Sequence, residues 1–161
     1  MVKKMIKYNE IQKIIEIIRE CSAIALKFYA QENLEVSIKN DNSPVTKADL
    51  EISKIATNKL SEIFPNDKII SEENITYLNK VDKNRYWLID PIDGTKEFIA
   101  KSGFFTINFA LISNNNPIFG IISQPTTSST WFNNNNTAYK ITNSYNIKDA
   151  KKLKPKTINY D

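Results

Sequence analysis

The fold is decided by residues 87–98, Trp87-Leu88-Ile89-Asp90-Pro91-Ile92-Asp93-Gly94-Thr95-Lys96-Glu97-Phe98. A short apolar run of strand-forming residues ends here in two aspartates that are three residues apart. Pro91 stiffens the turn expected between them, so that both carboxylates can point at one place beyond the end of the strand. Oxygen atoms are the ligands that hard cations such as Mg²⁺ prefer. Asp90 and Asp93 are therefore candidate metal ligands.

The residues that follow the aspartates suit an anion. Gly94 lets backbone amides approach an anion closely, and Thr95 adds a hydroxyl group beside the metal. The alternative is a turn in which the aspartates only accept hydrogen bonds from nearby backbone N–H groups. Two other motifs do not fit the spacing. Asp-x-x-Asp-Gly-Thr is one residue longer than the motif of phosphotransferases with an aspartyl nucleophile, and a calcium loop needs ligands at alternate positions and a closing glutamate.

A second strand upstream also ends in acidic residues. The apolar run at 68–71 leads into Glu72 and Glu73. Taken alone, this segment is typical of a solvated acidic loop. If the two strands are neighbours in one sheet, however, Glu72 can converge with Asp90 and Asp93 on one metal cluster.

Hydrophobic periodicity divides the rest of the chain into two helices followed by strands. Apolar residues recur at three- and four-residue spacing from Tyr8 to Tyr29 and again from Thr46 to Pro65, which predicts two amphipathic helices. Thr46 is expected to cap the second helix, with Asp49 completing a capping box. Short apolar runs predict strands at 68–71, 86–89, 104–113, 117–124, 129–132 and 137–141. This order predicts an α+β fold, in which the helices form a layer on a mostly antiparallel sheet.

The pattern also sets the expected domain boundary. Residues 1–141 carry the helices and strands and are expected to form one metal-binding domain. Residues 142–161 contain five lysines among scattered apolar residues and show no core pattern, so we interpret them as a basic tail. The 161-residue length agrees with one domain, or with one domain and the start of another.

Composition excludes several kinds of chemistry. The chain contains no histidine, which excludes Ser-His-Asp and Cys-His nucleophilic systems, histidine bases and histidine-bound zinc or iron. Cys21 is the only cysteine, so disulfides within the chain and cysteine metal clusters are also excluded. We interpret Cys21 as a buried and inert thiol on the first helix. A catalyst in this chain has to use carboxylates, hydroxyls or lysine.

The net charge of +4 does not point to nucleic acid. The basic residues are 20 lysines and 2 arginines spread along the chain, and neither Arg19 nor Arg85 lies in a basic cluster. Phosphate-reading surfaces tend to use arginine for its bidentate geometry. No uninterrupted apolar segment follows the first lysines, and the apolar runs are too short to cross a bilayer. We therefore expect a cytoplasmic protein that binds neither nucleic acid nor membrane.

Four motifs in one order resemble a known family. They are residues 40–49 (NDNSPVTKAD), 71–73 (SEE), 90–95 (DPIDGT) and 106–112 (TINFALI). Together they are similar to the inositol monophosphatase superfamily of metal-dependent phosphatases, and the resemblance covers essentially the whole chain. The continuation Lys96-Glu97-Phe98 resembles the 3'(2'),5'-bisphosphate nucleotidase branch, the CysQ type.

The resemblance implies a role for each matching residue. It implies Mg²⁺ ligands at Glu72, Asp90, Asp93 and the backbone carbonyl of Ile92. It assigns the activation of the attacking water to Asp49 and Thr95, with Glu72 also in the catalytic group. The substrate phosphate is expected to contact the metal-site carboxylates together with Gly94, Thr95 and Lys96. The implied reaction is in-line attack of a metal-activated water on a phosphomonoester, with two or three Mg²⁺ ions as cofactors.

The chain departs from the family pattern at its C-terminal end. Family members continue into a second α/β domain with a Trp-Asp motif, whose aspartate completes the second metal site. Here the sequence stops at Asp161, and Trp87 and Trp131 are not followed by aspartate. The second metal site is therefore expected to lack one ligand, and an uncovered face is expected to expose apolar surface.

Three functions remain open on this sequence. The first is hydrolysis of adenosine 3',5'-bisphosphate to AMP and phosphate, impaired to some degree by truncation. The second is an inositol monophosphatase-like activity on another small phosphomonoester. The third is an inactive remnant, or half of an enzyme that works as a homodimer or with a separate chain that supplies the second domain.

Overall fold

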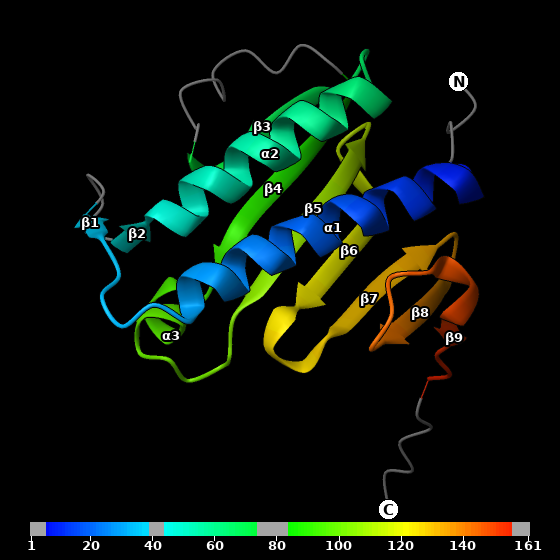
Figure 1. The fold of residues 1–161 in the computed structure, drawn as a ribbon. Coiled ribbons are helices and arrows are strands. Elements are labelled where there is room, and N and C mark those ends of the chain that lie inside the picture. Colours follow the sequence, from blue (N-terminus) through cyan, green and yellow to red (C-terminus); the bar gives the residue numbers. More distant parts are fainter. Residues whose placement is uncertain (1–5, 39–43, 74–83, 156–161) are drawn as a thin grey trace, which may run out of the picture.

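Two α-helices lie side by side on one face of a seven-stranded sheet (Figure 1). The computed structural model describes residues 6–38, 44–73 and 84–155. The helices are α1 (Tyr8–Tyr29) and α2 (Lys47–Ile63). In spatial order, the strands are β3 (Lys68–Ser71), β4 (Arg85–Asp93), β5 (Thr106–Ser113), β6 (Asn116–Gln124), β7 (Ser129–Asn134), β8 (Thr137–Thr142) and β9 (Lys151–Lys152). The predicted α+β class is confirmed.

One pair of strands determines where the acidic residues meet. All neighbours in the sheet are antiparallel except β3 and β4, which run parallel with Ser71 opposite Ile89. Parallel neighbours bring their C-terminal ends to the same edge of a sheet. The two strands that end in carboxylates are therefore neighbours in one sheet, which is the arrangement that Glu72 needs in order to converge with Asp90 and Asp93.

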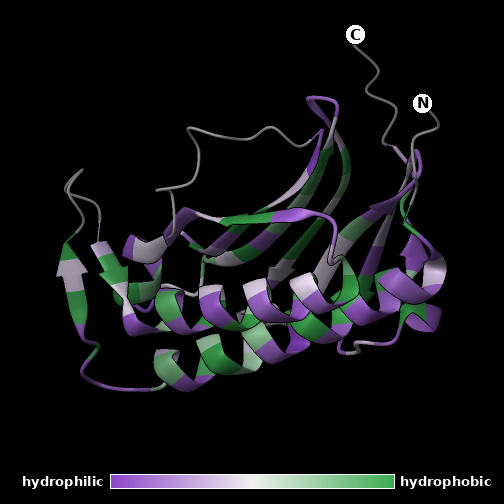
Figure 2. Cartoon of the chain, turned by 90° about the horizontal axis from the view of Figure 1, so that it is seen from above, coloured by the Kyte–Doolittle hydropathy of each residue, from purple (hydrophilic) through white to green (hydrophobic). Residues whose placement is uncertain are grey.

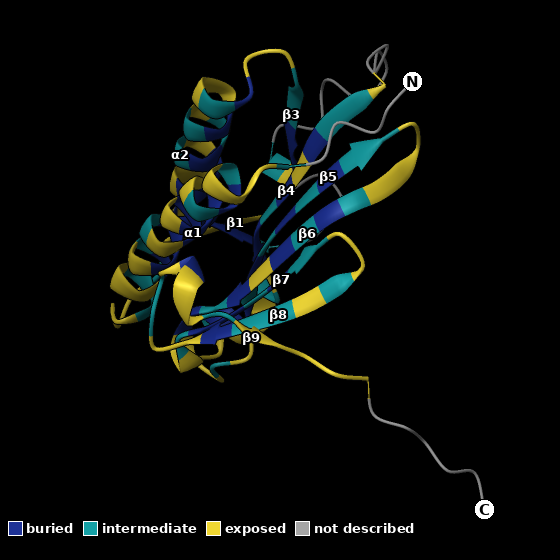
Figure 3. Ribbon diagram, turned by 90° about the vertical axis from the view of Figure 1, so that its right-hand side faces the viewer, coloured by how far each residue is buried: buried dark blue, intermediate teal, exposed yellow. Residues whose placement is uncertain are grey.

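The apolar stripe of α1 places the helix on the sheet. Its buried residues recur at helical spacing and include Ile11, Ile14, Ile15 and Ile18. Hydrophilic and hydrophobic residues alternate along both helices (Figure 2), and the buried residues gather where the helices meet the sheet (Figure 3). Cys21 is buried in this layer, as predicted, and burial raises the pKa of its thiol to about 12. The thiol therefore stays protonated at neutral pH and is a poor nucleophile.

The start of α2 confirms the predicted capping box. The Thr46 backbone N–H and its hydroxyl both donate to Asp49 Oδ2, at 2.8 and 2.6 Å, and the Thr46 side chain in return accepts from the third amide of the helix. These bonds satisfy groups that have no partner within the helix itself. They also hold the Asp49 side chain in place while leaving it only 2% exposed.

Several short elements were not expected from the sequence. Strands β1 (Val36–Ile38) and β2 (Pro44–Thr46) pair in a small separate sheet, and α3 (Thr95–Ile99) follows Gly94 directly. The short 3-10 helix η2 (Pro125–Thr127) connects β6 to β7. In addition, β4 extends to Asp93, four residues beyond the predicted end at Ile89.

The layer also extends past the boundary expected at residue 141. The 3-10 helix η3 (Ile147–Asp149) buries Ile147 against α1, where its backbone N–H donates to Gln12 Oε1 at 2.8 Å. Strand β9 then pairs with β8. The sequence shows no core pattern after residue 141, but one isoleucine and a few backbone hydrogen bonds suffice to dock this segment. Residues 156–161 of the tail, and 40–43 of the first motif, lie outside the described residues.

No helix within the described ranges is long and apolar enough to cross a membrane.

Aromatic packing holds α3 to the core. Phe98 and Phe105 are almost fully buried, their rings pack edge to face with centroids 4.8 Å apart, and Tyr29 of α1 contacts both. The neighbouring residue Phe104 is 74% exposed. Phe98 thus anchors the short helix that begins immediately after the candidate metal ligands.

The two adjacent phenylalanines give a matched test of this packing. Phe105→Ala should lower the free energy of unfolding by about 3–5 kcal/mol, because it leaves a cavity under α3. Phe104→Ala should change it by no more than about 0.5 kcal/mol, because that ring lies in solvent. Urea denaturation followed by circular dichroism measures both. Equal losses in the two variants would contradict the assigned packing.

Candidate active site

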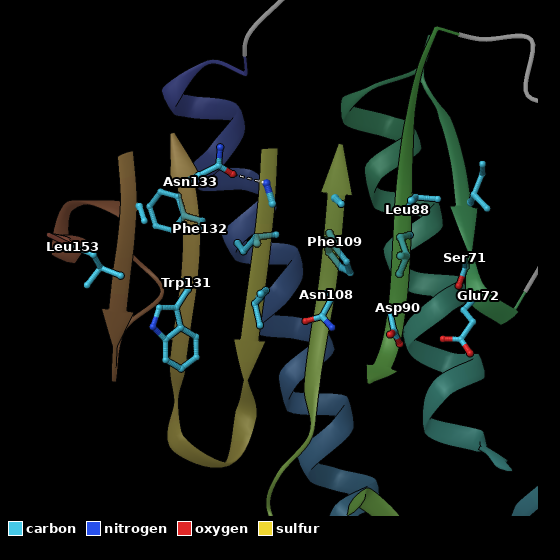
Figure 4. Close-up of a pocket in the computed structure, with 17 residues that line it drawn as sticks. Ser71, Glu72, Leu88, Asp90, Asn108, Phe109, Trp131, Phe132, Asn133 and Leu153 are labelled. Atoms are coloured by element: carbon cyan, nitrogen blue, oxygen red, sulfur yellow. Dashed lines mark hydrogen bonds between the residues drawn. The ribbon is translucent and has the colours of Figure 1, made fainter. Parts of the chain in front are cut away.

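The candidate site begins where β3 and β4 end. Ser71 lies opposite Ile89, so the next residues, Glu72 and Asp90, are neighbours at the same edge of the sheet. Figure 4 shows these two side chains on adjacent strands, at the same end. Glu72 is exposed and Asp90 is half-buried. The structure thus brings together two of the predicted metal ligands from segments 18 residues apart.

A β-bulge brings Asp93 to the same face. Asp90 lies opposite Asn108 of β5, whereas Asp93 lies opposite Thr106, so three steps along β4 match two steps along β5. In a regular strand, residues three apart point to opposite faces. The extra residue in β4 cancels this alternation, so Asp90 and Asp93 face the same side. A turn stiffened by Pro91 was expected between Asp90 and Asp93. The structure instead has a continuous strand in which Pro91 lies within the bulge, a position that tolerates a missing N–H group.

The charges of this cluster act most strongly on Asp90. Burial, the largest cause, and the negative charges of Glu72 and Asp93 together raise the pKa of its carboxyl to about 7. A smaller contribution comes from Asp49. Asp90 Oδ1 is buried and accepts no hydrogen bond from the described residues. A buried carboxylate oxygen beside other negative charges is a favourable position for a cation, which would compensate both the lost hydration and the repulsion.

The backbone after Asp93 forms a tight corner that requires glycine. Gly94 has a φ of 90°, and a Cβ atom there would lie 3.0 Å from the Phe104 carbonyl oxygen. Residues that carry a Cβ atom rarely adopt this backbone conformation. The corner starts α3 at Thr95, whose hydroxyl donates to the carbonyl of Ile92 at 3.1 Å. Ile92 itself is buried, while Lys96 is exposed on the outside of α3.

One residue of this site, Asn108, had no expected role beyond its place in the motif at 106–112. It lies opposite Asp90, and its Nδ2 donates to Asp93 Oδ2 at 3.1 Å. A polar residue between the apolar residues Ile107 and Phe109 was the available signal. Its partner could not be read from the sequence, because the contact crosses between two strands.

The oxygen donors of this site suit Mg²⁺, but the acidic side chains of the described residues lie too far apart to form a metal-binding group of three. Within residues 6–38, 44–73 and 84–155, no three or more Asp, Glu, His or Cys side chains are arranged closely enough to hold a metal ion together. The predicted ligand set does contain oxygen only, and it includes one buried carboxylate oxygen without a hydrogen bond. This chemistry fits a hard divalent cation.

A groove of about 710 Å³ runs from the carboxylates across the sheet face that the helices leave uncovered. We call it the open-face groove. Glu72, Asp90 and Asn108 line one end, and mostly apolar side chains, together with Asn133, line the rest (Figure 4). The apolar lining includes Leu88, Ile122, Trp131 and Leu153.

The fold and this acidic strand-end site define the class of protein. Residues 4–158 match the model of the inositol monophosphatase family, and the chain belongs to that family. Among curated relatives, it is 36% identical over 132 residues to the 3'(2'),5'-bisphosphate nucleotidase CysQ of Haemophilus influenzae, covering 80% of this chain and 49% of the relative. It is 42% identical over 118 residues to CysQ of Buchnera aphidicola, covering 71% and 44%.

Solved structures agree with these sequence matches. The crystal structure of CysQ from Bacteroides thetaiotaomicron, described as a bacterial member of the inositol monophosphatase family, superposes with a TM-score of 0.77 at 27% identity. That match covers 95% of this chain and 60% of the solved chain. The chain spans about half the length of the curated relatives it matches. The predicted family resemblance is confirmed.

The raised pKa of Asp90 gives a pH-dependent prediction for the metal-free protein. Its pKa is higher in the folded chain than in the unfolded chain, so the folded state binds more protons between about pH 4 and pH 7. Stability is therefore lost as the pH rises through this window. Asp90→Asn removes this loss. With allowance for screening at a half-exposed carboxyl, the variant should melt about 2–4 °C above the unaltered protein at pH 8 and show no gain at pH 4.

Differential scanning calorimetry in EDTA measures this difference. Glu62→Gln is the matched control, because Glu62 is exposed at the opposite end of α2 from Asp49. A gain at pH 4 as large as the gain at pH 8 would show that the carboxylate charge is not the cause.

Proposed function

We propose that the chain carries the metal- and phosphate-binding part of a 3'(2'),5'-bisphosphate nucleotidase, which converts adenosine 3',5'-bisphosphate to AMP and phosphate. The observation that supports it best is the meeting of Glu72, Asp90 and Asp93 at one edge of the sheet, with Asp90 Oδ1 buried and without a hydrogen bond. The curated relatives named bisphosphate nucleotidase support the substrate.

In this proposal, Glu72, Asp90, Asp93 and the carbonyl of Ile92 hold Mg²⁺. When bound, the ion supplies Lewis-acid stabilisation of the negative charge on the phosphate and on the leaving oxygen. The Gly94 corner turns the first amides of α3 towards the phosphate, since no side chain stands in the way. Asp49 and Thr95 orient the attacking water, and Asp49 takes its proton through the Thr95 hydroxyl. The capping hydrogen bonds from Thr46 fix Asp49 for this role.

The substrate preference rests on the residues after Thr95. Lys96 and Glu97 match the nucleotidase branch, and both are exposed on α3 beside the proposed phosphate site. A lysine ammonium group there suits a substrate with a second phosphate. An inositol monophosphatase-like activity is the alternative, since the metal and phosphate residues are common to both reactions.

Phosphate release tests the proposed reaction. Purified protein with Mg²⁺ should release phosphate from adenosine 3',5'-bisphosphate faster than from inositol monophosphate. Asp90→Asn should reduce the rate by at least about 100-fold, because it removes a charged metal ligand. Glu62→Gln should leave the rate unchanged. Activity that survives Asp90→Asn, or that does not need Mg²⁺, would refute the assigned metal site.

A second candidate function is that of a half-enzyme completed by a partner chain. The open-face groove supports it, because Leu88, Ile122 and Leu153 are each 38–45% exposed on a sheet face that none of the described helices covers. Sheets generally bury both apolar faces against other layers. The chain also spans only about half the length of its curated relatives. We propose that the occupant of this face is a chain equivalent to the C-terminal half of those relatives.

Mixing experiments test this partner. The separately produced C-terminal half of a curated relative should form a one-to-one complex with this chain and raise its phosphatase rate. Ile122→Lys should weaken the complex at least about 10-fold, because it places a charge on the face that the partner would bury. Ile38→Lys is the control, since Ile38 is 65% exposed on β1, outside the groove.

Size-exclusion chromatography with light scattering measures the complex. A homodimer that Ile122→Lys dissociates would show instead that a second copy covers this face. A monomer that ignores the added half would refute the half-enzyme.

A further inference from the structure

Asn108 contacts the candidate metal site from the neighbouring strand. It lies opposite Asp90, and its Nδ2 donates to Asp93 Oδ2. One residue of β5 therefore pairs with Asp90 on one side of the bulge and donates to Asp93 on the other. Figure 4 shows Asn108 beside Asp90 at the carboxylate end of the open-face groove.

The oxygen of the Asn108 amide makes no contribution to the hydrogen bonding of the described fold. Asn108 Oδ1 is buried and has no hydrogen-bond partner in the part of the chain that the structure describes. Leaving a buried amide oxygen unpaired destabilises a fold. Stability alone therefore does not explain an asparagine at this position, since the alternating strand would accept a β-branched residue.

A second asparagine in the same groove provides the contrast. Asn133 on β7 uses both ends of its amide. Its Oδ1 accepts from the Gly120 backbone N–H at 2.6 Å, and its Nδ2 donates to the carbonyls of Ile118 and Asn135. Asn133 thus stabilises the strands β6 and β7. Among the described residues, by contrast, the Asn108 side chain hydrogen-bonds only to a predicted metal ligand.

Repulsion among the carboxylates explains why Asp93 needs such a partner. Asp93 is exposed, and its negative charge acts against that of Asp90, which the charge of Glu72 also opposes. Without a restraint, the Asp93 side chain would rotate towards solvent, where the repulsion is weaker. A neutral N–H donor restrains one carboxylate oxygen without adding charge, and it leaves the other oxygen free to bind a cation.

We propose that Asn108 is a positioning residue that holds the Asp93 carboxylate in its metal-binding orientation; this inference rests on the proposed function. It assigns to Asn108 an effect on metal affinity that is separate from any effect on folding. Partners of this kind, which orient a metal ligand, typically contribute about 10- to 100-fold to metal affinity.

Isothermal titration of the full chain with MgCl₂ tests the proposal, together with thermal melting in EDTA. Asn108→Ala should raise the dissociation constant for Mg²⁺ by about 10-fold or more. Its melting temperature in EDTA should be unchanged or higher, because the substitution removes an unpaired buried oxygen. Asn133→Ala should lower the melting temperature and leave the dissociation constant unchanged. Asn108→Ser should weaken Mg²⁺ binding as Asn108→Ala does, because its hydroxyl is too short to reach Asp93.

The outcomes separate this inference from the function on which it rests. If the unaltered chain binds Mg²⁺ and both Asn108 variants bind it equally well, the positioning role is refuted and the metal site stands. If Asn133→Ala weakens Mg²⁺ binding as much as Asn108→Ala does, the effect is general to the groove, and the positioning role is again refuted. If the unaltered chain does not bind Mg²⁺, both proposals are refuted.

Discussion

The bulge in β4 is the constraint on which the candidate site depends. Without the extra residue at Pro91, Asp90 and Asp93 would face opposite sides of the sheet, one towards the helices and one towards the groove. With it, both lie on the uncovered face, next to the end of the parallel strand that delivers Glu72. The Asp-x-x-Asp spacing is thus a requirement of strand geometry as much as of metal chemistry. A shift of one residue would place one carboxylate against the apolar core.

Gathering these carboxylates costs free energy, and the surrounding packing offsets it. The raised pKa of Asp90 is a direct sign of that cost, since burial and neighbouring charges both disfavour its ionised form. On the helix side of the same strand, Trp87 and Ile89 are buried against α2 and the core. The aromatic contacts of Phe98 with Phe105 and Tyr29 hold the segment that follows. Packing of the apolar layer thus offsets the free energy lost to burial and repulsion of the carboxylates at this edge of the sheet.

Local patterns made much of the fold predictable. The bounds of α1 and β3 follow from hydrophobic spacing, and the capping box at Thr46 follows from residue types three positions apart. The identity of the acidic residues was also readable, because they directly follow apolar runs. Interactions between distant segments were not readable in this way. The parallel pairing of β3 with β4, the bulge and the contact of Asn108 with Asp93 all depend on which strands become neighbours. Ile147 was missed because one apolar residue in a polar segment has no periodicity.

The short strand β9 determines how this sheet meets other molecules. It contains two exposed lysines, Lys151 and Lys152, and it lies at one edge of the seven-stranded sheet. Long, flat edge strands invite further strands to add by hydrogen bonding, and brief lysine-rich ones oppose it by desolvation and charge repulsion. The sheet is therefore protected against edge-to-edge polymerisation at β9, even though one of its faces is apolar. Association by stacking onto that face remains open, so a partner would add a layer to this protein and not a strand.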